Sequence, residues 1–409
     1  ASNNTAVGKN ALVANTTGAY NTAVGKSAGA AITTGTRNTA VGGLALDAAT
    51  TADDNTAIGY HALTSATTGA ENVAIGRASL SELTTGASNV AVGYATLDAA
   101  TTASNNTAVG HNALTTNTTG TDNVAVGYEA LKAQTTGGYN VAVGRSAGGA
   151  ITTGEKNVVV GSAAADALTT ADQCTAVGYG ALGAATTADS NTAVGYHSLA
   201  VNTSGTRNVS VGTENMVSNT TGSDNTAIGT GALANNTTAG NNTAVGRSAL
   251  LANTTGAENV AIGKSALSAN TTANNNTAVG VNALLVNTTG LDANTTGTNS
   301  TAVGFNALSA NTTAVNNVAI GSQSMASATT GGYNTAVGNN TLQAHTTGNY
   351  NVAIGEQALY AKTTASNNTA VGASALLANT TGASNTAVGH NAADAITTSS
   401  YNVAIGGNS

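Results

Sequence analysis

The sequence predicts an all-β fold, a parallel β-solenoid (β-roll) of about 24 coils with a 17-residue repeat. The pentad Asn4–Gly8 (NTAVG) returns every 17 residues in close variants, which gives 23 full units and a partial 24th. Charged residues make up 7% of the chain, against roughly 25% in an ordinary soluble domain. The chain has 50 Gly and no Pro, and it is rich in Val, Ile and Thr, which favours a stacked array over disorder.

One repeat fits one coil. Seventeen residues are too few for a helical hairpin, whereas Thr-Ala-Val suits a short strand and the following Gly suits a turn. The period holds as far as Asn276, is interrupted by seven residues best placed at Leu291–Gly297, and resumes at Ser300. We therefore expect residues 1–409 to form a single β-solenoid repeat domain with an insertion near 291–297.

Numbering each unit from its Asn identifies a candidate core. Position 4 is Val or Ile and position 5 is Gly in all 24 units, while position 9 is Leu in 17 of 23. The four units that lack a large residue at position 9 carry a bulky aliphatic residue at position 12: Gly29 with Ile32, Gly148 with Ile151, Ala165 with Leu168, and Ala393 with Ile396. Close packing then predicts that positions 9 and 12 fill one inward volume. We also expect position 4 to point inward and, by alternation, position 2.

The remaining positions are small or polar in a regular way. Positions 3, 8 and 11 are mostly Ala, and position 13 is Thr in all 23 full units. Under this assignment they face outward, and two explanations stay open: tight turn geometry, or packing against another chain. Position 1 is Asn in 22 of 24 units, which predicts a ladder of amide hydrogen bonds along the stack.

Several classes of function are disfavoured. Lys and Arg total 11 and are scattered, so no basic patch for nucleic acid is expected. The single cysteine, Cys174, excludes a disulfide framework, and no apolar run approaches the ~18 residues of a membrane span. The chain starts and stops inside repeats, and we expect any export signal or anchor to lie outside it.

No constellation of catalytic, cofactor-binding or metal-binding residues is found, and the chain is predicted not to be an enzyme and to need no cofactor. The five histidines fall in separated units: His61, His111, His197, His345 and His390. Tyrosines gather at position 6 (Tyr60, Tyr94, Tyr128, Tyr179, Tyr196) and at position 17 (Tyr20, Tyr139, Tyr333, Tyr350, Tyr401). Exposed tyrosines can stack on sugar rings or protein, but simple surface variation near a turn is the favoured explanation.

The pentads NTAVG, NVAIG and NTAIG, each followed by two free residues and Ala or Ser, resemble the head repeats of YadA-type trimeric autotransporter adhesins. Similar NTAVG…AL…NTTG arrays occur in phage tail-fibre-like proteins. The resemblance covers essentially the whole chain and implies a left-handed β-roll, three chains in one assembly, and exposure at a cell or virion surface. The 17-residue period departs from the shorter coil of the adhesin heads.

These observations predict a non-catalytic extracellular fibre or adhesin shaft that self-associates as a homotrimer or filament and presents a surface to a glycan or host ligand. An ice-binding solenoid is the alternative, because the Thr rank at position 13 lies beside Ala at position 11. A glycan hydrolase or lyase on a β-helix is disfavoured by the lack of clustered acids.

Overall fold

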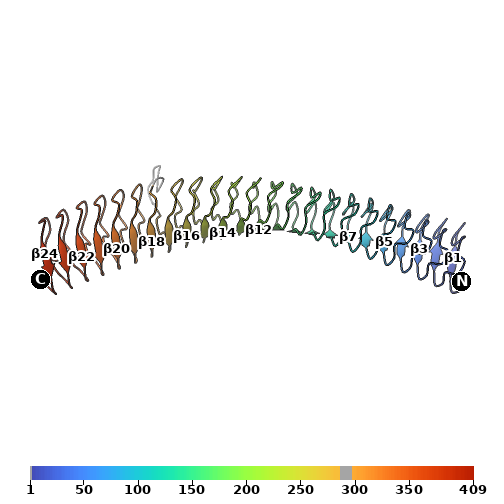
Figure 1. The fold of residues 1–409 in the computed structure, drawn as a ribbon, viewed down its shortest axis with the longest axis horizontal. Coiled ribbons are helices and arrows are strands. Elements are labelled where there is room, and N and C mark those ends of the chain that lie inside the picture. The colour runs from blue at the N-terminus through green and yellow to red at the C-terminus, as the bar shows by residue number, and fades with distance from the viewer. Residues whose placement is uncertain (1, 286–296) are drawn as a thin grey trace. The chain divides into compact units, whose positions relative to one another are not determined.

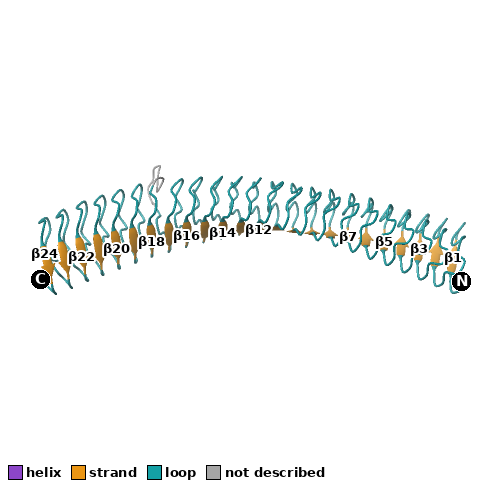
Figure 2. Ribbon diagram, viewed as in Figure 1, coloured by secondary structure: helices purple, strands orange, loops and turns teal. Residues whose placement is uncertain are grey.

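The computed structural model describes residues 2–285 and 297–409 and confirms the predicted fold class. Every regular element in these residues is a three-residue strand, and the paired strands run parallel (Figure 2). The chain divides into two compact units, Ala1–Ser204 and Gly205–Ser409. Within each unit the coils lie side by side, with the strands on one side and irregular turns on the other (Figure 1).

In the described residues, each unit contains twelve strands. The first holds β1 (Thr5–Val7), β2 (Thr22–Val24), β3 (Thr39–Val41), β4 (Thr56–Ile58), β5 (Val73–Ile75), β6 (Val90–Val92), β7 (Thr107–Val109), β8 (Val124–Val126), β9 (Val141–Val143), β10 (Val158–Val160), β11 (Thr175–Val177) and β12 (Thr192–Val194). The second holds β13 (Val209–Val211), β14 (Thr226–Ile228), β15 (Thr243–Val245), β16 (Val260–Ile262), β17 (Thr277–Val279), β18 (Thr301–Val303), β19 (Val318–Ile320), β20 (Thr335–Val337), β21 (Val352–Ile354), β22 (Thr369–Val371), β23 (Thr386–Val388) and β24 (Val403–Ile405).

The strand register follows the repeat. Within each unit equivalent positions of successive coils pair with one another, as Ala227 does with Ala244. The spacing is 17 residues except between β17 and β18, where Thr277 pairs with Thr301, 24 residues on. Seven extra residues therefore separate these two strands. The predicted insertion, Leu291–Gly297, lies outside the described residues apart from Gly297 itself.

The strands turn the opposite face inward from the one predicted. Ala at position 3, such as Ala244, is completely buried in the coil, whereas Val or Ile at position 4 projects outward and Ile262 keeps 40% of its surface exposed. The prediction that positions 2 and 4 point inward is wrong, although the alternation itself holds. The physical reason is volume, because a 17-residue coil encloses so little space that a methyl group fills the inner side of its strand.

Position 8 also belongs to the interior, so the idea that positions 3 and 8 are kept small for a neighbouring chain is wrong. Ala249 and Ala266 at position 8 are fully buried, as are Leu250 and Leu267 at position 9. Position 11, illustrated by Ala252, is only partly buried, as expected of a residue outside the core. The core of a typical coil is thus built from two alanines, a leucine and the residue at position 12.

The shared volume of positions 9 and 12 is confirmed. A Cβ atom added to Gly29 would lie 2.9 Å from the Cδ1 atom of Ile32, and one added to Gly148 would lie equally close to Ile151. Position 9 also adopts left-handed backbone angles, with φ of 57° at Gly29 and 51° at Leu97. Leucine in this conformation carries backbone strain, and its burial compensates for that strain.

This geometry predicts a compensating pair in the first unit. Leu97→Gly should destabilise the fold by about 2 kcal/mol or more, because lost packing outweighs the relief of roughly 1 kcal/mol of backbone strain. Adding Ala100→Ile, which copies the Gly29 and Ile32 pair, should recover part of the loss. Ala100 is fully buried at position 12 and, unlike Asn there, gives up no side-chain hydrogen bond when replaced.

Urea unfolding followed by circular dichroism measures the effect. Ala100→Ile alone is the matched control and should be destabilising, since it overpacks a coil that keeps its leucine. A double variant no more stable than Leu97→Gly would contradict the shared volume.

Asparagine and threonine ladders hold successive coils together, as predicted for position 1. The Asn21 Oδ1 atom accepts hydrogen bonds from the backbone N–H and the Nδ2 of Asn38, at 2.9 and 3.1 Å, and Asn38 Nδ2 also donates to the Ala52 carbonyl at 2.7 Å. At position 13 the Thr hydroxyl donates to a carbonyl of the next coil, as Thr33 does to Thr50 at 3.0 Å. These buried amides are therefore satisfied along the stack.

Position 5 needs glycine for two reasons. Gly246 has φ of 130°, and a Cβ atom placed on it would lie 2.7 Å from the carbonyl carbon of Gly263 in the next coil. Backbone meets backbone here, so no side chain can be accommodated. The tight turn after each strand is what allows the chain to leave the sheet within one residue.

Candidate functional site: an apolar sheet face and an aromatic rank

The most regular surface of each unit is the outer side of its strands. We call the side chains at positions 2 and 4 of β2–β12 and of β13–β23 the sheet face of the respective unit. Position 4 residues are the most exposed aliphatic side chains that repeat from coil to coil, with 37–40% of their surface free in these examples: Val24, Ile58, Ile75, Val109, Val143, Ile228, Ile262, Ile320, Ile354 and Val388.

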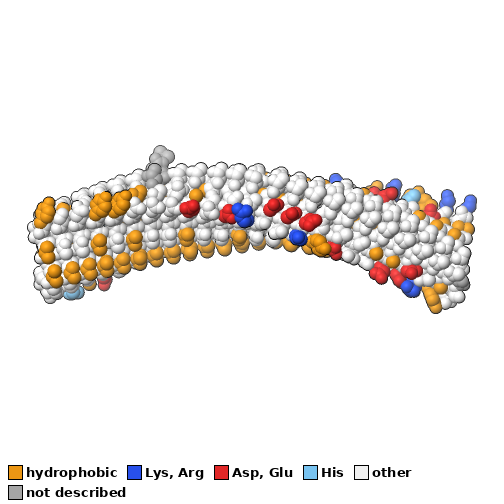
Figure 3. All heavy atoms as spheres, in the orientation of Figure 1, with side chains coloured by type: hydrophobic (Ala, Val, Ile, Leu, Met, Phe, Trp, Pro, Cys, Tyr) orange, Lys and Arg blue, Asp and Glu red, His pale blue; other side chains and the backbone are white. Residues whose placement is uncertain are grey.

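The sheet face is uncharged along its whole length. Position 2 is Thr or Val and position 4 is Val or Ile in every coil. A row of hydrophobic side chains follows the strands, most clearly over β13–β24, and the Lys, Arg, Asp and Glu side chains seen in this view lie beside the row and not in it (Figure 3). The eleven strands of each sheet face, spaced ~4.8 Å apart, span about 50 Å, so the apolar surface of one unit is continuous and not a scatter of single residues.

A second regular surface is the rank at position 6, directly after the glycine turn. Here His111 stacks between Tyr94 and Tyr128, with ring centroids 5.0 and 5.4 Å apart. Farther along the same unit Tyr179 stacks on Tyr196 at 5.8 Å. These tyrosines are about half exposed. The tyrosine positions found in the sequence therefore form an ordered stack on the surface.

The position 17 tyrosines behave in the same way where they occur in neighbouring coils. Tyr333 stacks on Tyr350 with centroids 5.1 Å apart, and both rings are more than half exposed. Tyr20 and Tyr139 are exposed too. Aromatic side chains therefore reach the surface at both positions, as a stack at position 6 and as one stacked pair at position 17.

Two ionisable side chains at position 12 are buried. Neither of them was identified as a core residue from the sequence. Lys362 and His345 are completely buried, in adjacent coils of the second unit. Lys362 Nζ donates to the Oδ1 of Asn351, and the His345 Nε2 atom lies 2.8 Å from the Gly348 carbonyl. Burial lowers the pKa of Lys362 to about 7, and burial with the neighbouring Lys362 charge lowers the pKa of His345 to about 4.

Cys174 replaces the asparagine of position 1 and is also buried. Its Sγ atom lies 3.2 Å from the Ala188 carbonyl, in place of an amide donor of the ladder. Burial raises the pKa of this thiol to about 11, which keeps it protonated and unreactive near neutral pH.

Within residues 2–285 and 297–409, no three His, Cys, Asp or Glu side chains gather in a way that could hold a metal ion. The same residues contain no helix with the length and apolar character of a membrane span. No protein-family model and no curated protein sequence matches the chain. The class of protein is therefore defined by the fold alone: a β-solenoid repeat protein with a 17-residue coil.

Proposed function

We propose that the chain is a non-catalytic structural or adhesive shaft at a cell or virion surface, whose copies associate through the sheet face. The observation that carries this proposal is the rank of Val and Ile at position 4, which is exposed in about half of the coils and half-buried in the others. An apolar surface of this length is costly to leave in water, and burying it against a partner is the direct way to remove that cost.

A second copy of the same chain is the partner that fits best. The sheet face repeats at one spacing and lacks charge, so an identical face offers complementary ridges of β-branched side chains with no charge to desolvate. The resemblance to trimeric adhesin heads supports three copies, and it also supports an extracellular setting. Tyrosines at positions 6 and 17 then remain available at the flanks for a glycan or a host-surface ligand.

Ice binding is a second candidate function, and two surfaces could support it: the Thr rank at position 13 and the sheet face. The Thr rank at position 13 is a poor ice-binding surface, because its hydroxyls already donate to carbonyls of the next coil, as Thr254 does to Thr271 at 3.1 Å. The sheet face is the better candidate, since position 2 supplies Thr in 14 of 24 coils beside the Val and Ile of position 4. Ice binding requires this face to stay uncovered, so the solution mass separates the two candidates.

Self-association is tested by light scattering on the parent and on Val245→Arg with Ile262→Arg. We expect a trimeric mass for the parent and a lower mass for the double variant, since two guanidinium groups per chain would be placed in an apolar interface. Thr238→Arg with Thr255→Arg is the matched control, because both threonines are exposed at position 14, and it should keep the parent's mass.

A parent that stays monomeric at micromolar concentration would overturn the association, and a thermal-hysteresis assay on that monomer would then test ice binding. An unchanged mass for Val245→Arg with Ile262→Arg would show that association uses a surface other than the sheet face.

A further inference from the structure

Between Tyr60 and Tyr196, the rank at position 6 of the first unit contains a single gap. Over nine successive coils its side chains are planar aromatic or guanidinium groups except at Ser162: Tyr60, Arg77, Tyr94, His111, Tyr128, Arg145, Ser162, Tyr179 and Tyr196. Tyr179 stacks on Tyr196 on one side, and Arg77 lies over the Tyr94 ring at 5.7 Å. On its other side, toward Ser162, Tyr179 has no planar neighbour in the rank.

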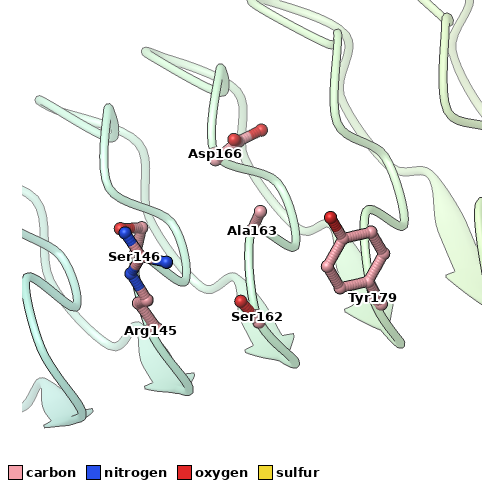
Figure 4. A pocket seen from close by; sticks show the side chains of 6 residues that line it. All are labelled: Arg145, Ser146, Ser162, Ala163, Asp166 and Tyr179. Carbon is pink, nitrogen blue, oxygen red and sulfur yellow. The ribbon is translucent and has the colours of Figure 1, made fainter.

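A hollow of about 260 Å³ lies at this gap, lined by Arg145, Ser146, Ser162, Ala163, Asp166 and Tyr179. Figure 4 shows Ser162 and Ala163 on the middle coil, with Arg145 on the coil before it, Tyr179 on the coil after it, and Asp166 above. A second hollow of about 330 Å³ shares Ala163, Asp166 and Tyr179 and extends toward His197. The small residues at positions 6 and 7 leave this space open.

The width of the gap indicates the shape of a guest. Rings one coil apart in this rank have centroids 5.0–5.8 Å apart, and Arg145 and Tyr179 are two coils apart, so the gap is roughly 10 Å across. A flat aromatic ring touching both neighbours would need only about 7–8 Å. A thicker, puckered ring fits the remaining space better.

The groups around the gap match a sugar. The free face of Tyr179 can stack on the C–H face of a pyranose. The Ser146 and Ser162 hydroxyls and the Asp166 carboxylate can accept hydrogen bonds from sugar hydroxyls, and Arg145 can donate to ring and hydroxyl oxygens. Asp166 keeps an exposed surface, so its carboxyl group can reach a ligand, and local desolvation raises the pKa of this carboxyl.

We propose that the gap at Ser162 is a glycan-binding subsite in which one pyranose ring lies between Tyr179 and Arg145, with its hydroxyls directed to Asp166 and Ser162. This names a ligand class for the adhesive part of the proposed function. Self-association through the sheet face is tested by the solution mass, and the subsite is tested by glycoside binding. The two proposals can therefore fail independently.

The test is saturation-transfer NMR with methyl glycosides of glucose, galactose, mannose and N-acetylglucosamine. We expect transfer to the ring C–H protons of at least one glycoside in the parent protein. Ser162→Tyr, which continues the aromatic rank, should abolish it by filling the gap, and Asp166→Asn should weaken binding by about tenfold. Thr230→Tyr, at position 6 of the second unit, is the control and should leave binding unchanged.

Circular dichroism and light scattering on Ser162→Tyr should match the parent, which separates loss of the subsite from loss of the fold or of association. The proposal is overturned if none of the glycosides shows transfer, or if Ser162→Tyr binds as well as the parent.

Discussion

Lys362→Asn should stabilise the second unit by about 3–5 kcal/mol at neutral pH, the largest gain expected from a single substitution in this protein. The parent buries an amine whose pKa falls from 10.5 to about 7, and this shift is the cost of withholding its charge from water. Asparagine is the commonest residue at this position, and Asn379 in the next coil donates to the Gly382 carbonyl at 3.0 Å and accepts from its N–H at 2.9 Å. The variant should gain an equivalent pair of hydrogen bonds.

The sign of the pH dependence follows from the same shift. Between about pH 7 and 10.5 the unfolded chain binds a proton at Lys362 that the folded chain does not, so the parent should become more stable as pH rises through this window. His345 should have the same effect at lower pH, so the parent should also become more stable as pH rises from about 4 to 6.5. Lys362→Asn should remove the first window and leave the second largely in place.

Urea unfolding at about pH 7 and about pH 9.5 measures both effects. The difference between parent and variant should shrink toward the higher pH. Lys264→Asn is the control, because Lys264 occupies position 6 outside the core, and it should change stability little at either pH. Equal stability of the parent and Lys362→Asn at neutral pH would show that the amine is not buried in solution.

Ala244→Arg should unfold the coils around β15, a loss of about 4 kcal/mol or more. Ala244 is completely buried and pairs with Ala227 and Ala261 in the neighbouring coils, so an inward guanidinium has neither space nor a counter-charge. Because each coil is stabilised by its neighbours, the damage should spread to them.

The adjacent residue provides the control. Val245→Arg places the same side chain on the sheet face, and the fold should be retained while association weakens. Thermal melts by circular dichroism, with hydrogen exchange to locate the disrupted coils, distinguish the two. If Val245→Arg unfolded the protein and Ala244→Arg did not, the orientation of the strands would be the reverse of that described here.

The repeat, the parallel register and the pairing of positions 9 and 12 could all be predicted from the sequence, because each leaves a periodic trace. The alternation could not show which side of each strand points into the core, since Ala at position 3 and Val at position 4 are both apolar. A finer signal was present: Val159, the one large residue at position 3, lies in the coil where position 9 is Ala165. Both are fully buried, so the extra volume of one matches the reduced volume of the other.

The candidate sites depend on which side of the strands points outward. Free exchange of Val and Ile at position 4 is typical of a side chain that projects where an extra methylene meets no wall, and the sheet face follows from it. The gap at Ser162 could not be predicted without the structure, because the sequence shows tyrosines at position 6 but not that their rings stack at one spacing.

The uniform strand register also bears on how such a chain can change in length. With few exceptions, such as Cys174, described coils meet the next through the same partners: paired strands, an amide of position 1 on the next amide, and a hydroxyl of position 13 on the next carbonyl. Removing or duplicating a whole 17-residue repeat recreates an identical junction between coils. An insertion or deletion of another length within the ladder positions would shift the ladders out of register. The 24-residue step between β17 and β18 keeps Thr277 opposite Thr301, so the strand register is preserved across the surplus residues. Unequal recombination between near-identical repeats would therefore yield folded proteins of many lengths, all with the same cross-section.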